Sequence, residues 1–393
     1  MALLPETRNV LQLGAAFCLI FLAFNSQGFI EEPVIESASK RGDIDVHAGY
    51  YSQSMIYAVD TFGNFVAAPI VDLISAKWAM VFGGLTYCVF LAGFLFLNAP
   101  YLYTMSCILG FGAALIWTGQ GTYLAQNCTA HTSGRNSSIG SLIGGGLFIF
   151  VVFKTTGTTD NIADSTTKIM YGVFTGLAAI GIVVIALLPA PPPYLAVNNI
   201  KAQKEDWRQL TIKTFRIMAT SNFIILAPAF AYTGLMNSFW AGVYPSCISF
   251  TKLLGNDRQS LVAINAMVSG AGQCVAGVLI GYLSSRNAHL GRHFIVLMGT
   301  VVNVVGLVLV FINFPHDANL QSTDATAYIQ PSVAIALIVG FLFGFGDGCW
   351  NTQIYAHLVA NFPRESSQAF AVYKFYKSAL TCAAFYYNSK LPV

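Results

Sequence analysis

The chain has 393 residues, of which 55% are hydrophobic and only 9% are charged, and its formal net charge is +3. Soluble domains carry roughly a quarter charged residues because their surfaces face water, so this composition excludes an ordinary soluble domain. Basic and aromatic residues are not interleaved along any exposed stretch, which argues against nucleic acid as a partner. The eight cysteines include no C-x-x-C pair, and we expect no disulfide framework, no metal site and no cofactor.

The apolar residues form long stretches, and a helix that crosses the hydrocarbon core needs about 20 of them. Eleven stretches qualify, which predicts an all-α membrane protein. In chain order we expect spanning helices over residues 9–30, 50–74, 78–98, 102–126, 137–154, 169–189, 222–248, 260–283, 293–314, 331–357 and 367–388. A twelfth helix would complete two equal halves, but the chain ends at Val393, which we interpret as a shortened isoform or an incomplete gene model.

The helices fall into two groups that are separated by a long, basic, polar segment. We expect an N-terminal six-helix bundle over residues 1–189, a cytoplasmic linker over residues 190–221 and a truncated C-terminal bundle of five helices over residues 222–393. A proline run at the start of the linker ends the sixth helix because proline lacks the amide donor. Within the linker, residues 207–218 space apolar side chains at a helical period, which fits a short helix on the membrane surface and equally fits a solvated linker.

Loop charges set the expected orientation. With a cytoplasmic N-terminus, the segments on that side carry more Lys and Arg than those on the opposite side, as the positive-inside rule requires. Acidic residues gather in the first outer loop, namely Glu31, Glu32, Glu36, Asp43 and Asp45. We therefore expect a multi-pass protein surrounded by membrane lipid, with its N-terminus in the cytoplasm. The plasma membrane and endolysosomal membranes are both compatible with this pattern.

A short pattern occurs once in each half of the chain. It runs from Gly-Phe-Gly through Trp-x-x-Gln to Arg-x-Ser-Ser, and its key residues are Gly110, Gly112, Trp117, Gln120 and Arg135 in the first copy and Gly344, Gly346, Trp350, Gln353 and Arg364 in the second. Parallel repeats of six helices are typical of major facilitator transporters. The pattern therefore predicts a major facilitator fold of two pseudo-repeated helical bundles.

A second correspondence follows the second and eighth predicted helices. Asp72 and Lys77 follow Ala68 at the spacing of the major facilitator loop motif, whereas the second copy, from Gly277 to Arg286, lacks the acid. In that motif an acid and a base hold neighbouring helix ends together. We therefore expect a one-sided cytoplasmic clasp made by Asp72 and Lys77.

Four ionisable residues stand out inside predicted spanning helices, where such a group costs several kcal/mol unless it is paired or hydrated. Asp60 lies in the second helix, Asp347 in the tenth, and Lys374 and Lys377 in the eleventh. One hypothesis pairs Asp347 with Lys374; in the alternative, both lysines reach the cytoplasmic face. Asp60 is either a protonatable group in a central cavity or a neutral carboxyl group bonded to a neighbouring helix, and both interpretations remain open.

Amide side chains accompany the repeated pattern. Gln120, Gln353 and Asn351 either line a central cavity or join helices, which is the commoner use of amides in membranes. The surrounding glycines predict close helix contacts. The two copies also differ, because Asp347 lies three residues before Trp350, where the first copy has Ala114.

These residues resemble the uncoordinated-93-like family of the major facilitator superfamily. The matching stretches lie within residues 13–28, 117–121, 134–137, 345–355 and 369–375, and those of the second half are most similar to the subgroup called major facilitator superfamily domain-containing protein eleven. The chain departs from the family in the glycines at 144–146 and in its missing twelfth helix. The resemblance implies a major facilitator fold. Some relatives regulate a potassium channel complex, others escort nucleic-acid-sensing receptors, and the subgroup resembles solute carriers without an assigned substrate.

The sequence thus predicts a solute-carrier-like transporter of an unknown small solute. Cavity and coupling candidates are Asp60, Gln120, Asp347, Gln353, Asn351 and Lys374. The alternative is a regulator or escort that binds an ion channel or receptor subunit within the membrane. We expect no enzymatic activity, because no nucleophile–base pair or metal-ligand constellation occurs in the chain.

Overall fold

The computed structural model describes residues 4–39, 44–45, 48–127, 164–192, 207–255, 257–286 and 292–388. These residues form helices and connecting loops, with one isolated bridge between Thr251 and Thr323. The first helices are α1 (Pro5–Ser39), α2 (Ala48–Ile74), α3 (Ala76–Gly93), α4 (Ala99–Gln126) and α7 (Asp164–Ala186). They are followed by α9 (Trp207–Met218), α10 (Ser221–Ser238), the π-helical turn η2 (Phe239–Val243), α11 (Tyr244–Phe250), α12 (Arg258–Arg286), α13 (Arg292–Asn313), α14 (Val333–Asn361) and α15 (Ser366–Asn388).

The spanning helices expected from the sequence are found wherever the structure describes them, and residues 137–154 lie outside the described part. Nine segments of the described part are long and apolar enough to cross a membrane. The α15 helix falls below that hydropathy because it carries Lys374 and Lys377. The helical alternative for residues 207–218 is confirmed by α9.

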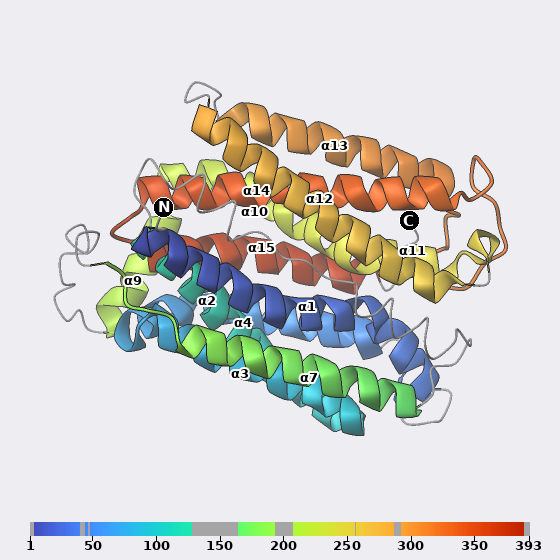
Figure 1. The fold of residues 1–393 in the computed structure, drawn as a ribbon, viewed down its shortest axis with the longest axis horizontal. Helices are drawn as coiled ribbons and strands as arrows, with labels where there is room; N and C mark the ends of the chain where they lie inside the picture. Colours follow the sequence, from blue (N-terminus) through green and yellow to red (C-terminus); the bar gives the residue numbers. More distant parts are fainter. Residues whose placement is uncertain are drawn as a thin grey trace.

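The helices lie side by side along the long axis of the molecule (Figure 1). In the first part of the chain α2 and α3 pack against α4, and α1 packs against α7; in the second part α12 and α13 pack against α14. The α15 helix packs against α10 and also against α2. It therefore joins helices of the two expected bundles, 1–189 and 222–393, whose boundaries stay predictions.

The repeated glycines bring three helices together in each half. A Cβ atom on Gly110 would overlap the carbonyl oxygen of Ile56 in α2, and one on Gly112 would overlap a side chain of α3. In the second half, a Cβ on Gly344 would overlap the backbone of α12, and one on Gly346 would overlap a side chain of α13. Small residues at such crossings let helix backbones approach closely in a membrane, so the expected packing role of these glycines is confirmed.

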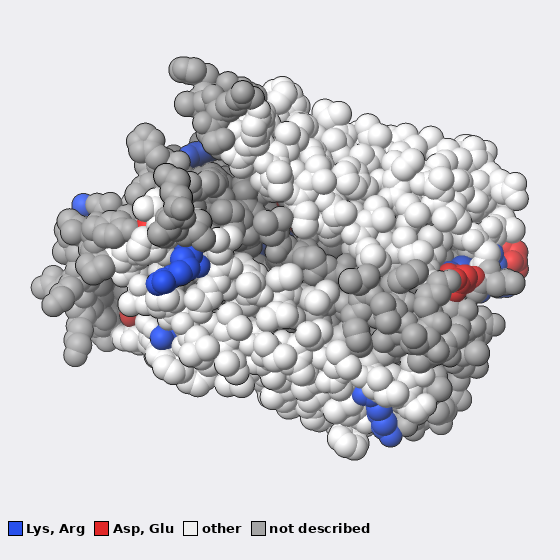
Figure 2. Space-filling view, in the orientation of Figure 1, with Lys and Arg blue, Asp and Glu red and all other residues white. Residues whose placement is uncertain are grey.

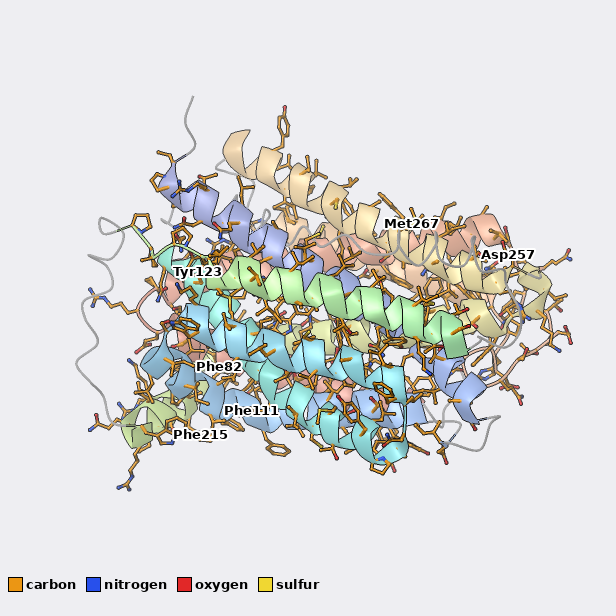
Figure 3. The ribbon with its side chains drawn as sticks, turned by 60° about the horizontal axis from the view of Figure 1, so that its bottom comes forward. Phe82, Phe111, Tyr123, Phe215, Asp257 and Met267 are labelled. Atoms are coloured by element: carbon orange, nitrogen blue, oxygen red, sulfur yellow. The ribbon has the colours of Figure 1, made fainter. Side chains whose placement is uncertain are left out.

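The outer surface is apolar between two charged ends. In Figure 2 the visible Lys, Arg, Asp and Glu side chains of described residues lie toward the ends of the molecule. Large apolar side chains are exposed in the middle of helices, for example Phe62 of α2, which is 72% exposed. Figure 3 shows Tyr123 and Asp257 near opposite ends of the bundle, with Phe82 and Phe111 at its outer surface. Such a surface is suited to lipid, since water would penalise exposed apolar area.

Candidate functional site

A cavity of about 190 Å³ lies between helices of the two parts of the chain. Its wall consists of side chains from α1, α2, α3 and α4 and from α10, η2, α11, α12, α14 and α15. On α1 the lining begins at Phe21 and ends at Glu31, and on α2 it runs from Gly49 to Asp60. Because α1 begins and α2 ends on the N-terminal side (left in Figure 1), the cavity occupies the middle of the bundle and the half that is farther from that side.

A buried lysine lies at the inner end of the cavity. The ammonium group of Lys374, on α15, lies 4.0 Å from the ring centroid of Trp117, on α4. A cation over an indole face is stabilised by the negative face of the ring. Asp60, on α2, interacts electrostatically with Lys374 and accepts a short hydrogen bond from the hydroxyl group of Ser378. The sequence indicated no partner for Asp60, whereas the structure places Ser378 and Lys374 beside it. Both interpretations of Asp60 stay predictions.

Asp347 is held by amide groups. Its carboxyl group accepts hydrogen bonds from Asn351 at 2.7 Å and from Gln273 of α12 at 3.1 Å. Lys377 donates to the amide oxygen of Asn351 at 3.4 Å and interacts electrostatically with Asp347. The arrangement places two carboxyl groups and two ammonium groups from three helices around one cavity.

The direct ion pair between Asp347 and Lys374 is not formed. In the described part of the chain, ion pairs join Lys213 to Glu365 and Lys252 to Asp324, but Asp347 and Lys374 have no such contact. The physical reason is the position of Trp117, which holds the ammonium group of Lys374 over its ring. Neither lysine reaches the N-terminal face, because both line the cavity.

The two glutamines of the repeated pattern differ in position. Gln120 lines the cavity and accepts a hydrogen bond of 3.2 Å from the hydroxyl group of Tyr355 on α14. Gln353 is buried within the protein but does not line this cavity. Trp350 does not line the cavity either, and it packs against Tyr232 of α10 with ring centroids 4.8 Å apart. The structure therefore brings Asp60, Asn351, Asp347, Lys374 and Gln120 together around the cavity but leaves Gln353 outside its lining.

On the N-terminal side, the two parts of the chain are in direct contact. Asp72, near the end of α2, accepts hydrogen bonds of 2.7 Å from Ser367 and of 2.7 Å from Gln368 in the first turn of α15. A carboxylate is favoured there because the first amide groups of a helix carry partial positive charge. Lys77 donates instead to the carbonyl oxygen of Leu188, after α7, at 3.4 Å. The two expected clasp residues thus contact different helices, and Asp72 joins the two parts of the chain.

The sequence interpretation missed Glu31, which it assigned to an outer loop. The α1 helix continues to Ser39, and Glu31 is 2% exposed and lines the cavity. The signal for the longer helix is the buried apolar series Ile30, Val34 and Ala38, which has helical spacing. Lys377 and Ser378 also line the cavity, and no short-range pattern marks the serine.

The sequence model of a family described as ion channel regulatory protein UNC-93 matches residues 40–393 of the chain. The chain belongs to the UNC-93 family. A relative in this family, UNC93-like protein MFSD11 of Xenopus tropicalis, is 32% identical over 417 residues, which cover 98% of this chain and 92% of that protein. UNC93-like protein 3 of Arabidopsis thaliana is 26% identical over 409 residues, covering 97% of this chain and 80% of that protein.

Solved structures show which fold this UNC-93 family member adopts. The proton:xylose symporter XylE matches with a TM-score of 0.62 at 12% identity, over 98% of this chain and 87% of that one. The E. coli fucose:proton symporter FucP, solved as a point variant, matches with a TM-score of 0.62 at 12% identity, over 97% of this chain and 91% of that one. The chain therefore has the major facilitator fold and is a multi-pass membrane protein of solute-carrier-like architecture.

Proposed function

We propose that this protein moves a small solute across the membrane by exposing its central cavity to one side and then to the other. The observation that carries the proposal is the group of two carboxyl and two ammonium groups, supplied by both parts of the chain and enclosed in one cavity. Buried charges are costly in a membrane and usually mark a substrate or ion pathway. A solute that binds there contacts α2 and α4 as well as α14 and α15.

The cavity indicates the chemistry of the solute. Its volume of about 190 Å³ is below the roughly 300–1,000 Å³ of sites for drug-sized ligands, so the solute is small. Asp60 and Asp347 offer acceptors, Lys374 and Lys377 offer donors, and Trp117 offers an aromatic face. A polar solute that carries both donors and acceptors matches these groups.

The contacts on the N-terminal side support a gate there. Besides the Asp72 hydrogen bonds, the ring of Phe370 on α15 occupies the space beside Gly121 of α4 so closely that a Cβ atom on the glycine would overlap it. With the N-terminus in the cytoplasm, as the loop charges predict, the cavity of this structure faces the outside or the lumen. The gate would then be the cytoplasmic one.

Uptake into vesicles tests the proposal. The purified protein, reconstituted in proteoliposomes, is given a panel of radiolabelled amino acids, sugars, organic acids and amines. We expect at least one to accumulate above empty vesicles, and we expect Asp60→Asn to abolish its uptake because Lys374 then loses a balancing charge. If no member of the panel enters faster than in empty vesicles, or if Asp60→Asn does not slow the uptake, the proposal fails.

Regulation of a channel or receptor subunit is the second candidate, and the family's description as ion channel regulatory protein favours it. In that function the lipid-facing surface would bind a partner, and the central charges would only stabilise the fold. Capture with crosslinking in native membranes, followed by mass spectrometry, tests this candidate. A channel or receptor subunit whose capture is unchanged by Asp60→Asn would favour it. We propose no enzymatic role, since the cavity carboxyl groups accept hydrogen bonds from amide groups and from Ser378 rather than activating a nucleophile.

A further inference from the structure

A buried carboxyl group at the outer end of the cavity has no cationic partner in the described part of the chain. Glu31 is 2% exposed and lies three residues beyond Gly28, where the membrane-spanning part of α1 ends. One of its oxygens, Oε2, accepts a hydrogen bond from the amide group of Gln53 on α2. The other, Oε1, is buried and has no hydrogen-bond partner among the described residues.

The charges around the cavity do not balance. Its lining contains three carboxyl groups, Glu31, Asp60 and Asp347, but two ammonium groups, Lys374 and Lys377. Both lysines interact electrostatically with Asp60 and Asp347. The extra negative charge therefore belongs to Glu31.

Titratable neighbours of Glu31 do not supply the missing positive charge. Those that interact with it electrostatically in the described part are Tyr57 on α2 and Tyr171 on α7, and neither is cationic. Ser52 and Gln53 of α2 and Gln27 of α1 are its polar neighbours. On α3, α4, α12 and η2, which also contact α1, no described charged group interacts with Glu31.

Gln27 can be a hydrogen-bond partner of neutral Glu31, although its amide group also favours the charged form. Gln27 lies four residues earlier on the same face of α1, and it is fully buried with neither amide atom hydrogen-bonded in the described structure. A protonated carboxyl group donates one hydrogen bond, and the amide oxygen of Gln27 can accept it. In the neutral form this hydrogen bond gives partners to two buried atoms, Oε1 of Glu31 and the amide oxygen of Gln27, and an unsatisfied buried polar atom costs about 1–3 kcal/mol. A divalent cation would need about six oxygen ligands, which this site does not offer.

We propose that Glu31 is a proton-binding site of the cavity, loaded from the side opposite the N-terminus, and that its proton is coupled to solute movement. The coupling rests on the proposed transport function, whereas the proton binding does not. When the cavity faces the opposite side, Glu31 takes a proton and becomes neutral. When the gate on the N-terminal side opens, water reaches the carboxyl group and the proton leaves to that side.

The titration range of Glu31 supports this assignment. Burial raises the pKa of its carboxyl group to about 7, although the hydrogen bond from Gln53 opposes the rise. A group with a pKa near neutrality gains and loses its proton within the physiological range. Asp60 differs from Glu31 because both lysines of the cavity interact electrostatically with it.

Infrared difference spectroscopy of the purified full-length protein in nanodiscs tests the proton site directly. The carbonyl band of a protonated carboxyl group is followed between pH 5 and pH 9 in the natural chain, in Glu31→Gln and in the surface control Glu365→Gln. We expect one band that disappears with a midpoint near 7, that is absent in Glu31→Gln and that persists in Glu365→Gln. A band with that midpoint that persists in Glu31→Gln, or no band that titrates between pH 5 and pH 9, overturns the proposal.

A second variant keeps the test decisive if Glu31→Gln fails to fold. Gln53→Met removes a hydrogen bond that favours the charged form, so the midpoint should rise by up to about one pH unit, a tenfold gain in proton affinity. An unchanged midpoint in Gln53→Met would contradict the assignment to Glu31.

If the band titrates as expected but no solute of the uptake panel enters vesicles, the proton site stands and transport of those solutes fails. Solute uptake without a titrating band would instead support transport and overturn the proton site.

Discussion

The two copies of the repeated pattern, in α4 and α14, share their packing but not their cavity chemistry. Gly110 and Gly344 each bring their helix against α2 or α12, so the glycines set the same register in both halves. When Gly110 is aligned with Gly344, Asp347 corresponds to Ala113 and Asn351 corresponds to Trp117. All four of these residues line the cavity. The sequence comparison matched Asp347 with Ala114 instead, because it aligned the tryptophans.

One missing residue explains the difference between the copies. Seven positions separate Gly110 from Trp117, but six separate Gly344 from Trp350. Each residue of an α-helix turns the chain by about 100°, so the second Trp-x-x-Gln is rotated away from the cavity relative to its glycines. Trp350 consequently packs against Tyr232, and Gln353 is not part of the lining. A repeat can therefore preserve a fold while one deletion changes which residues reach the site.

The largest expected effect concerns what the copies share. Gly110→Val and Gly344→Val should each destabilise the protein by more than about 2 kcal/mol, because a side chain would force α4 from α2 or α14 from α12. Thermal unfolding in detergent measures this. The control is Gly172→Val, since a Cβ atom there meets no atom within 4 Å. Equal melting temperatures in all three variants would show that the glycines do not set the register.

A second prediction separates the acids of the two halves. Lys374→Met alone or Asp60→Asn alone should cost about 3 kcal/mol, because each leaves a buried charge uncompensated. The double variant should be more stable than the sum of the two changes predicts, by at least about 1 kcal/mol. Lys374→Met combined with Asp347→Asn should show a smaller coupling, because the ammonium group of Lys374 interacts more strongly with Asp60 than with Asp347. Strictly additive effects in the first pair would remove the electrostatic account of the cavity.

The smallest effect concerns the two tryptophans. Trp117→Leu removes the aromatic face beneath Lys374, an interaction of about 0.5–2 kcal/mol. For a transported solute, we expect the apparent KM to rise by up to about tenfold in Trp117→Leu and to stay within about twofold in Trp350→Leu. Trp117→Phe, which keeps an aromatic face, should lie between them. Equal changes in the two leucine variants would mean that the rotation of the second copy has no functional consequence.

The sequence was informative where local pattern decides the structure and uninformative where tertiary contacts do. Apolar length predicted the helices, and the paired glycines predicted close helix crossings. The carboxyl group of Asp60 was identified as costly, but its partner Ser378 is 318 positions away and no local pattern links the two. Gln353 was expected to mirror Gln120, because the shared motif was easier to see than the missing residue before it.

Glu31 shows a different reason for failure. A helix that is predicted from hydropathy ends where the charged residues begin, so the expected first helix stopped at residue 30. The α1 helix continues to Ser39, and Val34, Ile35 and Ala38 in this extension are buried in the protein. Hydropathy describes contact with lipid, and helical spacing describes contact with protein. The second criterion would have kept Glu31 in the helix.

The central claim is that the cavity opens to alternate sides around a fixed group of charges. Pulsed electron spin resonance between spin labels at Leu73 on α2 and Arg364 before α15 measures it directly, since both residues are exposed on the N-terminal side and belong to different parts of the chain. Labels at Leu73 and Phe82, both within the first part, serve as the control pair.

We predict a short and a long distance between the first pair of labels, with the long one enriched in Asp72→Asn. That substitution weakens two charge-assisted hydrogen bonds to α15, each of about 1.5–3 kcal/mol. The control pair should give one unchanged distance. A single distance between Leu73 and Arg364, the same with and without Asp72→Asn, would contradict the account.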